Sequence, residues 1–426
     1  MATAANDPAS ERDYFTDLSV LLDPYDYFEG IRRNGPVYQM KSRDMLLVTG
    51  FQEGVEVLLN AADFSSCLNP DPVAPLRFEP EGDDLTPQIE ATMDTGPMDL
   101  MVQYDGDRHA AARSLLNPLF TPSRLKANEE FMRTFADGMV REMVGKGACE
   151  MINEVATPYV TMVIADLLGV PDEDREEFRK IIDSAPPPGN MNDTGSAEVV
   201  HPLMIMGGYF MRYMQERSAA PQDDVMTELV QATYPDGSKP PLMEVVKTAM
   251  FLFAAGQDTS AKLLGNAMRF LCEDQAMQQH LRENRDQIGP FLEEALRLEG
   301  STKATFRLAK RKTRIGDVEV PAGKRVVVAL PAANRDPRRW EAPHEFRLNR
   351  PKIKEHLAFG RGAHTCAGAP LARAEVAVIL DRFLEHTRAI TLSEAHHGPK
   401  DARRISYEPS YIIRGLADLH VEFVPA

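Results

Sequence analysis

One ten-residue segment, 359–368, constrains this 426-residue chain more than any other. It contains three glycines, which permit a tight backbone that closely approaches a ligand, and one cysteine, Cys366. Helical periodicity begins directly afterwards, near Pro370, so Cys366 is expected at the start of a helix. A thiolate there gains from the free backbone N–H groups and the helix dipole. An isolated cysteine of this kind is more often a buried structural residue, and the segment alone leaves that alternative open.

The rest of the chain predicts mostly helices, because apolar residues recur at helical spacing. Expected helices are 25–34, 51–62, 107–119, 122–146, 155–168, 172–183, 202–217, 242–272, 275–284, 289–298 and 370–386. Expected strands are 36–40, 45–49, several between 304 and 333 with a hairpin at 315–323, and more in 405–424. Residues 64–106 read as a long irregular loop with one short helix near 87–92. Without repeats or linkers, the chain is expected to be mainly α with a smaller β part (α+β), in a single domain, 1–426.

The composition predicts a soluble globular protein, with 43% hydrophobic and 26% charged residues. The net charge of −16 argues against binding to nucleic acid or anionic membranes. Apolar runs such as 249–256 fall short of the roughly 18 residues of a membrane span, and the polar N-terminus predicts no export signal. We therefore expect a cytoplasmic protein with reduced cysteines. Residues 301–373 carry 17 Lys and Arg against 6 Asp and Glu, so this segment is basic in an acidic chain.

The full spacing of the cysteine segment, Phe-Gly-x-Gly-x-His-x-Cys-x-Gly followed by Leu-Ala-Arg, resembles the haem-thiolate loop of the cytochrome P-450 family. The resemblance covers nearly the whole chain. It implies the single-domain P-450 fold, with haem b between two long helices. It also implies that Cys366 is the axial ligand of the haem iron, that Phe359 packs against it, that Gly368 belongs to the same cofactor-binding loop, and that His364 reaches a haem propionate.

A charged pair, Glu294 and Arg297, shares one helix face. On its own this spacing is typical of a solvated surface. In the family the pair is buried with a later arginine, and Arg350 occupies that place. The resemblance assigns these three residues a structural role.

The long helix 242–272 contains Ala255, Gly256, Asp258 and Thr259. A glycine inside a helix costs about 1 kcal/mol against alanine, and a plain kink is one explanation for it. The family's oxygen-binding groove has an acid and an alcohol at this position. The resemblance implies that Thr259 hydrogen-bonds dioxygen and that Asp258 relays protons from solvent.

Positively charged residues are expected at the haem carboxylates. His109 and Arg113 share a helix face, and Arg307 is expected to open a strand. Each alone is more often a solvated surface residue. The resemblance places them with His364 around the propionates, for which arginine is a natural bidentate partner. Asp107 stands where many relatives have proline, which is expected to affect the start of the helix.

The substrate pocket is expected above the haem, with walls from 64–106, 184–211, the long helix, 301–306 and the tail near Tyr411. Its readable side chains are mainly apolar, which predicts a small to medium apolar substrate, although most of them taken singly are more often core residues. They are Met98, Met101, Met204, Met206, Met250, Phe251, Phe253, Ala254 and Ile412. Lys303 could meet a substrate carboxylate, although a lysine at this place is more often solvated or lies outside the pocket.

The resemblance implies a bacterial, soluble monooxygenase that activates O₂ with electrons from NAD(P)H, through a ferredoxin reductase and an iron–sulfur ferredoxin. We expect a monomer, with ferredoxin docking on the face of the cysteine loop. The candidate contacts are Arg108, Arg124, Lys352, Lys354 and Arg361. Two alternatives keep the fold: a peroxide-using or isomerising haem-thiolate enzyme, and a non-enzymatic haem sensor. The intact Asp258–Thr259 pair argues against both.

Overall fold

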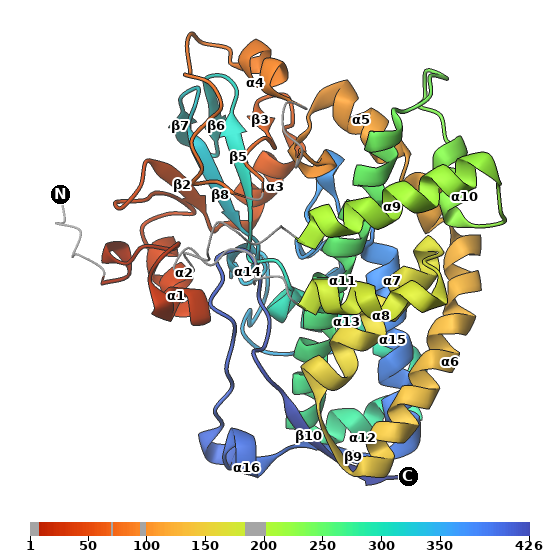
Figure 1. The fold of residues 1–426 in the computed structure, drawn as a ribbon. Helices are drawn as coiled ribbons and strands as arrows, with labels where there is room; N and C mark the ends of the chain where they lie inside the picture. Colours follow the sequence, from red (N-terminus) through yellow and green to blue (C-terminus); the bar gives the residue numbers. More distant parts are fainter. Residues whose placement is uncertain (1–7, 70, 94–98, 184–201) are drawn as a thin grey trace.

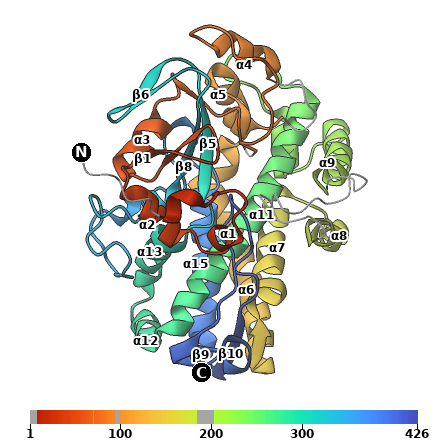
Figure 2. The same ribbon diagram turned by 90° about the vertical axis from the view of Figure 1, so that its left-hand side faces the viewer.

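The computed structural model describes residues 8–69, 71–93, 99–183 and 202–426. Figure 1 shows a β-rich layer with short helices beside a larger body of long helices. The side view in Figure 2 shows α11 running through the middle of this body, where it packs against α7 and α15. The mainly α architecture with a smaller β part is as the sequence predicts.

Amphipathic and apolar helices make the body, and their buried faces form one large hydrophobic cluster. Helix α15 packs against α6 and α13, while α11 packs against α7, α9 and α13. The long helices are α6 (Pro122–Lys146), α7 (Thr157–Leu168), α8 (Asp172–Asp183), α9 (Pro202–Ala219), α11 (Leu242–Glu273), α13 (Ile288–Glu299) and α15 (Ala369–His386). The shorter ones are α1 (Leu18–Leu22), α2 (Tyr25–Arg32), α3 (Phe51–Leu59), α4 (Thr86–Thr92), α5 (Gly106–Ser114), α10 (Val225–Gln231), α12 (Gln275–Glu283), α14 (Leu330–Ala333) and α16 (Glu394–His397).

The main sheet has the strand order β1-β2-β8-β5-β3. Only β2 and β8 run parallel among its neighbouring pairs. The strands are β1 (Val37–Gln39), β2 (Met45–Val48), β3 (Phe64–Ser65), β5 (Ala304–Ala309) and β8 (Arg325–Ala329). The hairpin expected at 315–323 is formed by β6 (Thr313–Ile315) and β7 (Val318–Val320), with its turn at Gly316 (φ +54°). A third sheet joins β4 (Ala148–Glu150), β10 (His420–Pro425) and β9 (Thr387–Leu392).

The structure differs from the sequence expectation at several places. Helix α10 and strand β9 were not expected, and a π-helical segment, η4 (Met151–Ala156), precedes α7. In 405–424 the expected strands are largely absent: the described backbone has isolated bridges there, such as Tyr407 with Leu416, before β10 begins. Arg307 lies within β5 opposite Val326, whereas the sequence placed it at the start of the strand.

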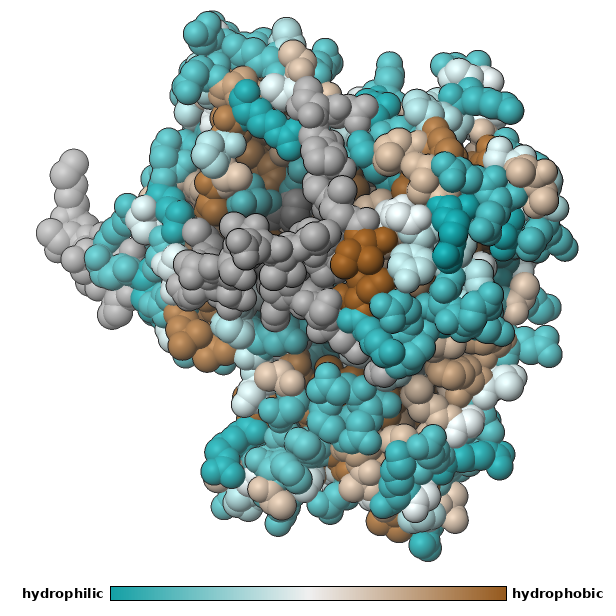
Figure 3. Space-filling view, viewed as in Figure 1, coloured by the Kyte–Doolittle hydropathy of each residue, from teal (hydrophilic) through white to brown (hydrophobic). Residues whose placement is uncertain are grey.

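One stretch of the described residues, Met151–Leu168, is long and apolar enough to cross a membrane, whereas the sequence scan predicted none. About 67% of it is buried inside the protein, so it also fits the core helix of a globular fold. It is weak support for a membrane span. On the face shown in Figure 3, hydrophilic residues predominate and hydrophobic ones form small patches between them.

Candidate active site

The cysteine loop closes on itself before α15 begins. The Cys366 N–H donates to the Phe359 carbonyl at 2.9 Å, and two of the loop glycines have positive φ, Gly360 (+67°) and Gly362 (+76°). A Cβ atom on Gly362 would lie 2.4 Å from the carbonyl oxygen of Leu58. Glycine is therefore required at 362 both for its conformation and for the close approach to the end of α3.

Cys366 alone is exposed among the chain's four cysteines, all of which are described. Burial by surrounding protein raises the pKa of its thiol, while the N–H of Gly368 and the guanidinium of Arg113 act to lower it. Helix α15 begins at Ala369, three residues later, so its first free N–H groups face the sulfur. The thiol is thus deep within the protein and still accessible, as expected of a group that lines an internal site.

Four basic side chains, from three separate parts of the chain, surround one region next to the cysteine. The rings of His109 and His364 lie 3.9 Å apart, and Arg113 and Arg307 contribute positive charge to both. Burial and these neighbouring charges lower the pKa of His364 to about 2, and burial lowers that of Arg307 to about 10. His109 Nε2 is buried without a hydrogen-bond partner. The two guanidinium groups supply the positive charge, and the imidazole of His109 adds an unpartnered ring nitrogen, so the region suits bound carboxylates.

Helix α11 passes this region without a break. The Thr259 hydroxyl donates to the Ala255 carbonyl at 2.8 Å, and Ala255 itself is exposed although it lies in the middle of the helix. A Cβ atom on Gly256 would lie 2.3 Å from Cδ1 of Ile164. In this structure Gly256 therefore allows α7 to pack closely on α11. The Ser301 hydroxyl donates to the Thr259 carbonyl at 2.7 Å and ties α11 to the segment before β5.

Asp258 belongs to a charged chain that the sequence analysis did not find. Lys262 Nζ lies 3.1 Å from Asp258 Oδ1 and 2.6 Å from Glu408 Oε2. The spacing of Asp258 and Lys262 on one helix face was readable in the sequence. Glu408 comes from the C-terminal segment, and no local pattern pointed to it.

The Glu294, Arg297 and Arg350 side chains are brought together in the core. Arg297 donates to both carboxylate oxygens of Glu294, at 2.8 and 2.9 Å, and Arg350 Nε lies 3.0 Å from Oε1. The Glu294 and Arg297 side chains are completely buried. Arg297 also donates to the carbonyls of Asn334 and Pro343, so the group fixes the segment that leads to the cysteine loop.

A second buried ionic group beneath the cysteine loop was missed. Arg373 pairs with Glu293 at 2.5 Å and covers the Phe359 ring at 4.6 Å, and His356 lies 3.1 Å from the same carboxylate. Burial opposes ionisation of Glu293, but its hydrogen bonds to His356 and Arg373 lower its pKa to about 2. The Leu-Ala-Arg sequence after the loop was a usable signal for Arg373.

Lys303 is buried, so the solvated position expected for it is wrong, whereas its relation to a substrate stays a prediction. It is 1% exposed, and its ammonium donates to the backbone carbonyls of Leu21 and Ser410. Burial, followed by the charge of Arg414, lowers its pKa to about 7. It joins α1 and the C-terminal segment to the end of the main sheet.

The family model for Cytochrome P-450 matches residues 79–411. The chain belongs to the cytochrome P-450 family. It is similar to Cytochrome P-450 144 of Mycobacterium tuberculosis, with 31% identity over 393 residues that cover 91% of this chain and 88% of the relative. Among solved structures it is similar to substrate-free CYP150A6 from Mycobacterium marinum, with 46% identity, a TM-score of 0.90 and coverage of 98% and 100%. CYP109E1 from Bacillus megaterium in complex with corticosterone gives 26% identity, a TM-score of 0.79 and coverage of 94% and 98%.

Cytochrome P-450 proteins are haem-thiolate monooxygenases that carry haem b, and this chain is therefore a bacterial P-450 enzyme. The residues present fit that cofactor. Cys366 offers an accessible thiol, and the unpartnered His109 Nε2 lies in a basic cluster suited to the carboxylates. No group of three or more metal-ligating side chains occurs in the described parts of the chain.

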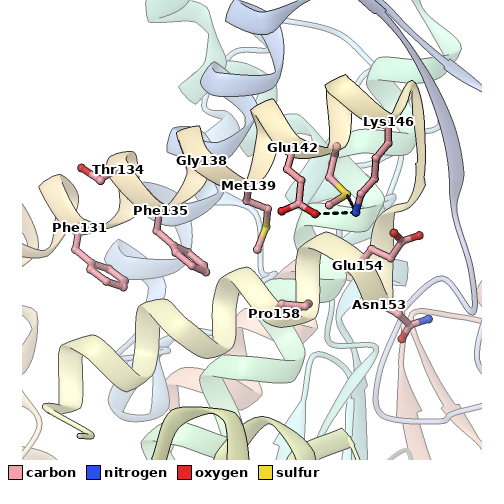
Figure 4. A pocket seen from close by; sticks show the side chains of 11 residues that line it. Phe131, Thr134, Phe135, Gly138, Met139, Glu142, Lys146, Asn153, Glu154 and Pro158 are labelled. Carbon is pink, nitrogen blue, oxygen red and sulfur yellow. Dashed lines mark hydrogen bonds and ion pairs between the residues drawn. The ribbon is translucent and has the colours of Figure 1, made fainter. Parts of the chain in front are cut away.

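A groove of about 870 Å³ lies on another part of the molecule, between α6 and the residues 151–158. Figure 4 shows its aromatic and Met139 side chains between the helices, and the Glu142–Lys146 ion pair (2.8 Å) at one end. None of the predicted site residues lines it. Residues 94–98 and 184–201, which include parts of the expected substrate walls and Met98, lie outside the described residues.

Proposed function

We propose that this P-450 inserts one oxygen atom of O₂ into a small to medium apolar substrate, within a single domain that spans the chain. The observation that carries the proposal is the placement of Asp258 and Thr259 on α11 together with the accessible thiol of Cys366. Bound haem supplies the redox chemistry of oxygen activation. The protein supplies the ligand, the carboxylate anchors and the protons.

Each residue then has a defined role. Cys366 holds the cofactor and donates electron density, and the N–H groups of Gly368 and Ala369 moderate that donation. His109, Arg113, Arg307 and His364 hold the carboxylates. Thr259 orients the reacting oxygen and passes a proton to it, and Asp258 restores that proton.

The side chains of α11 just before Gly256 support an apolar substrate. Phe251 and Ala254 are partly exposed and Ala255 is exposed, whereas Met206 and Phe253 are completely buried in the core. The structure of CYP109E1 contains corticosterone, which is a largely apolar molecule. A screen of apolar compounds by the haem spin-state shift tests the substrate class, and binding of polar compounds only would contradict it.

We infer that electrons arrive from NAD(P)H through a ferredoxin reductase and a ferredoxin, in the cytoplasm, to a monomeric enzyme. Lys352 and Lys354 are exposed beside the cysteine loop and Arg361 is half-buried there, so they support a basic docking face. Arg108 and Arg124 are weaker candidates because each pairs with a glutamate. Arg361→Glu is expected to slow ferredoxin-dependent reduction and to weaken its salt dependence. Unchanged rates in this variant would place the docking face elsewhere.

The decisive experiment is product formation in a reconstituted electron chain, compared between the parent and Thr259→Ala. We expect the variant to release more hydrogen peroxide for each product formed, because proton delivery is impaired. Unchanged coupling would favour the peroxide-using or isomerising alternative. If the protein binds haem but forms no product from any compound that shifts the haem spin state, a haem sensor would be favoured.

A further inference from the structure

The chain of ion pairs Asp258–Lys262–Glu408 includes a lysine of α11, Lys262, to which the proposed function gives no role. Lys262 lies one helical turn after Asp258, and its side chain is 7% exposed. The two carboxylates at its ends are more accessible, with 35% of the Asp258 side chain and 22% of the Glu408 side chain exposed. The buried ammonium is therefore the middle of a three-group chain with accessible ends.

The Lys262 ammonium is held in place from both sides. Burial acts to lower its pKa, but the charges of Asp258 and Glu408 outweigh burial and raise it. Lys262 therefore stays charged and serves as an electrostatic anchor. Its bond to Asp258 uses Oδ1, while Oδ2 is buried and has no hydrogen-bond partner.

The C-terminal segment is shaped to accept this lysine. The Glu408 N–H donates to the Gly415 carbonyl at 3.0 Å, and Tyr407 forms a bridge with Leu416, so positions 408 and 415 lie side by side. A Cβ atom on Gly415 would lie 2.4, 2.6 and 2.9 Å from Cδ, Cγ and Cε of Lys262. The absence of a side chain at 415 thus leaves the space through which the lysine stem reaches Glu408.

We propose that Lys262, anchored by Glu408 and given room by Gly415, is a positioning residue that orients Asp258 for proton transfer to Thr259. This rests on the proposed monooxygenase function. The step moves no electrons: Asp258 takes a proton from a hydronium ion of the solvent, whose O–H bond breaks as an O–H bond forms on the carboxylate. That proton passes to the Thr259 oxygen as the hydroxyl gives its own proton to the reacting oxygen, and both groups return to their starting states.

The charge of the chain favours such a relay. Two carboxylates and one ammonium carry a net −1, so the chain becomes neutral when it takes up one proton. Because Lys262 fixes Oδ1, the second oxygen of Asp258, which is buried and has no hydrogen-bond partner, is left to carry the proton inward to Thr259. Loss of the ammonium leaves the carboxylate free to rotate, and misplacement of a proton-transfer group by about 1 Å can cost 10²-fold in rate.

The first test replaces Lys262 with methionine in the haem-loaded enzyme with its electron partners. Lys262→Met keeps the apolar stem and removes the charge. Product formed per NAD(P)H is expected to fall about tenfold, which is less than the roughly 10²–10⁴-fold contribution of a general acid–base group because Asp258 itself remains. The solvent isotope effect on turnover is expected to rise. Substrate affinity, measured by the spin-state shift, is expected to stay the same. Unchanged coupling and isotope effect would overturn the proposal.

The matched control is Arg269→Met on the same helix. Arg269 is also largely buried and pairs with Glu273 and Glu299, but it lies seven residues further along α11, about 10 Å. It is expected to lower stability without changing the coupling. An equal loss of coupling in both variants would attribute the effect to a weakened helix and would also overturn the proposal.

The second test displaces the ammonium without removing its charge. Gly415→Ala places a methyl group on the lysine stem, so its crystal structure is expected to show a lengthened Lys262–Asp258 distance. Coupling is expected to fall as in Lys262→Met, and the double variant to be no worse than either single one. Normal coupling despite a displaced ammonium would contradict the proposal, and this variant decides the question if Lys262→Met does not fold.

The parallel variant Thr259→Ala separates this proposal from the proposed function. If Thr259→Ala loses coupling and Lys262→Met does not, the positioning role is wrong and the monooxygenase mechanism stands. If neither loses coupling, the mechanism itself is wrong.

Discussion

Replacement of Glu294 by glutamine is expected to destabilise the enzyme while leaving the shape of the core intact. The carboxylate accepts from both Arg297 and Arg350, and from the Arg347 N–H at 3.0 Å. An amide keeps one acceptor oxygen, turns N–H groups toward the guanidinium groups and leaves their charges uncompensated. Breaking a buried ion pair in this way costs about 3–5 kcal/mol.

The expected fall in the midpoint temperature of thermal unfolding follows from the chain length. At about 2.1 cal/mol/K per residue, unfolding of 426 residues has an entropy of about 0.9 kcal/mol/K, so the midpoint falls by about 3–6 °C. Thermal unfolding of the haem-loaded enzyme measures it. The control is Glu142→Gln in the exposed pair with Lys146, which is expected to shift the midpoint by less than about 1 °C. Equal midpoints for both variants would refute the view that the buried charges stabilise this segment.

Three further predictions concern other parts of the site. Gly362→Ala is expected to reduce haem loading, because its Cβ meets the Leu58 carbonyl and its φ is +76°; full loading would show that the loop can shift. Arg307→Ala is expected to speed haem loss to apomyoglobin without changing the thiolate spectrum, and unchanged loss would separate Arg307 from the carboxylates. The pKa of Lys303 is lowered to about 7 in the folded protein, against about 10.4 for an ordinary lysine. Between these two pH values Lys303 is protonated in the unfolded chain and neutral in the folded one, so the unfolded chain binds one more proton. The stability of the parent is therefore expected to rise with pH in that window relative to Lys303→Met, and parallel pH curves would contradict this.

The sequence was most informative where local pattern decides the structure. The periodicity of the long helices and the turn at Gly316 were predictable because they depend on nearby residues. Helix α10 is only seven residues long, and it was missed because one or two turns are too short to show a clear helical periodicity of apolar residues. The C-terminal segment was misread as strands because long-range hydrogen bonds fix its backbone: Asn266 of α11 donates to the Arg414 carbonyl, and Arg414 donates to the Leu22 carbonyl in α1. Such contacts outweigh local strand propensity.

Site chemistry was predictable only as far as family motifs reach. The cysteine loop and the Asp258–Thr259 pair could be read directly from the sequence. Glu408, the second partner of Lys262, is 146 residues away, and Lys303 is fixed by the carbonyls of Leu21 and Ser410. Such pairs depend on the fold as a whole, so a lysine in the sequence gives no indication of which acceptor it meets.

The central claim is that Cys366 supplies the thiolate ligand of the haem, and the spectrum of the reduced protein with carbon monoxide tests it most directly. The parent is expected to give the far red-shifted band that gives the family its name. Cys366→Ser is expected to lose that band while its fold, followed by circular dichroism, is retained. A parent that binds haem without the band, or a serine variant that keeps it, would contradict the assignment.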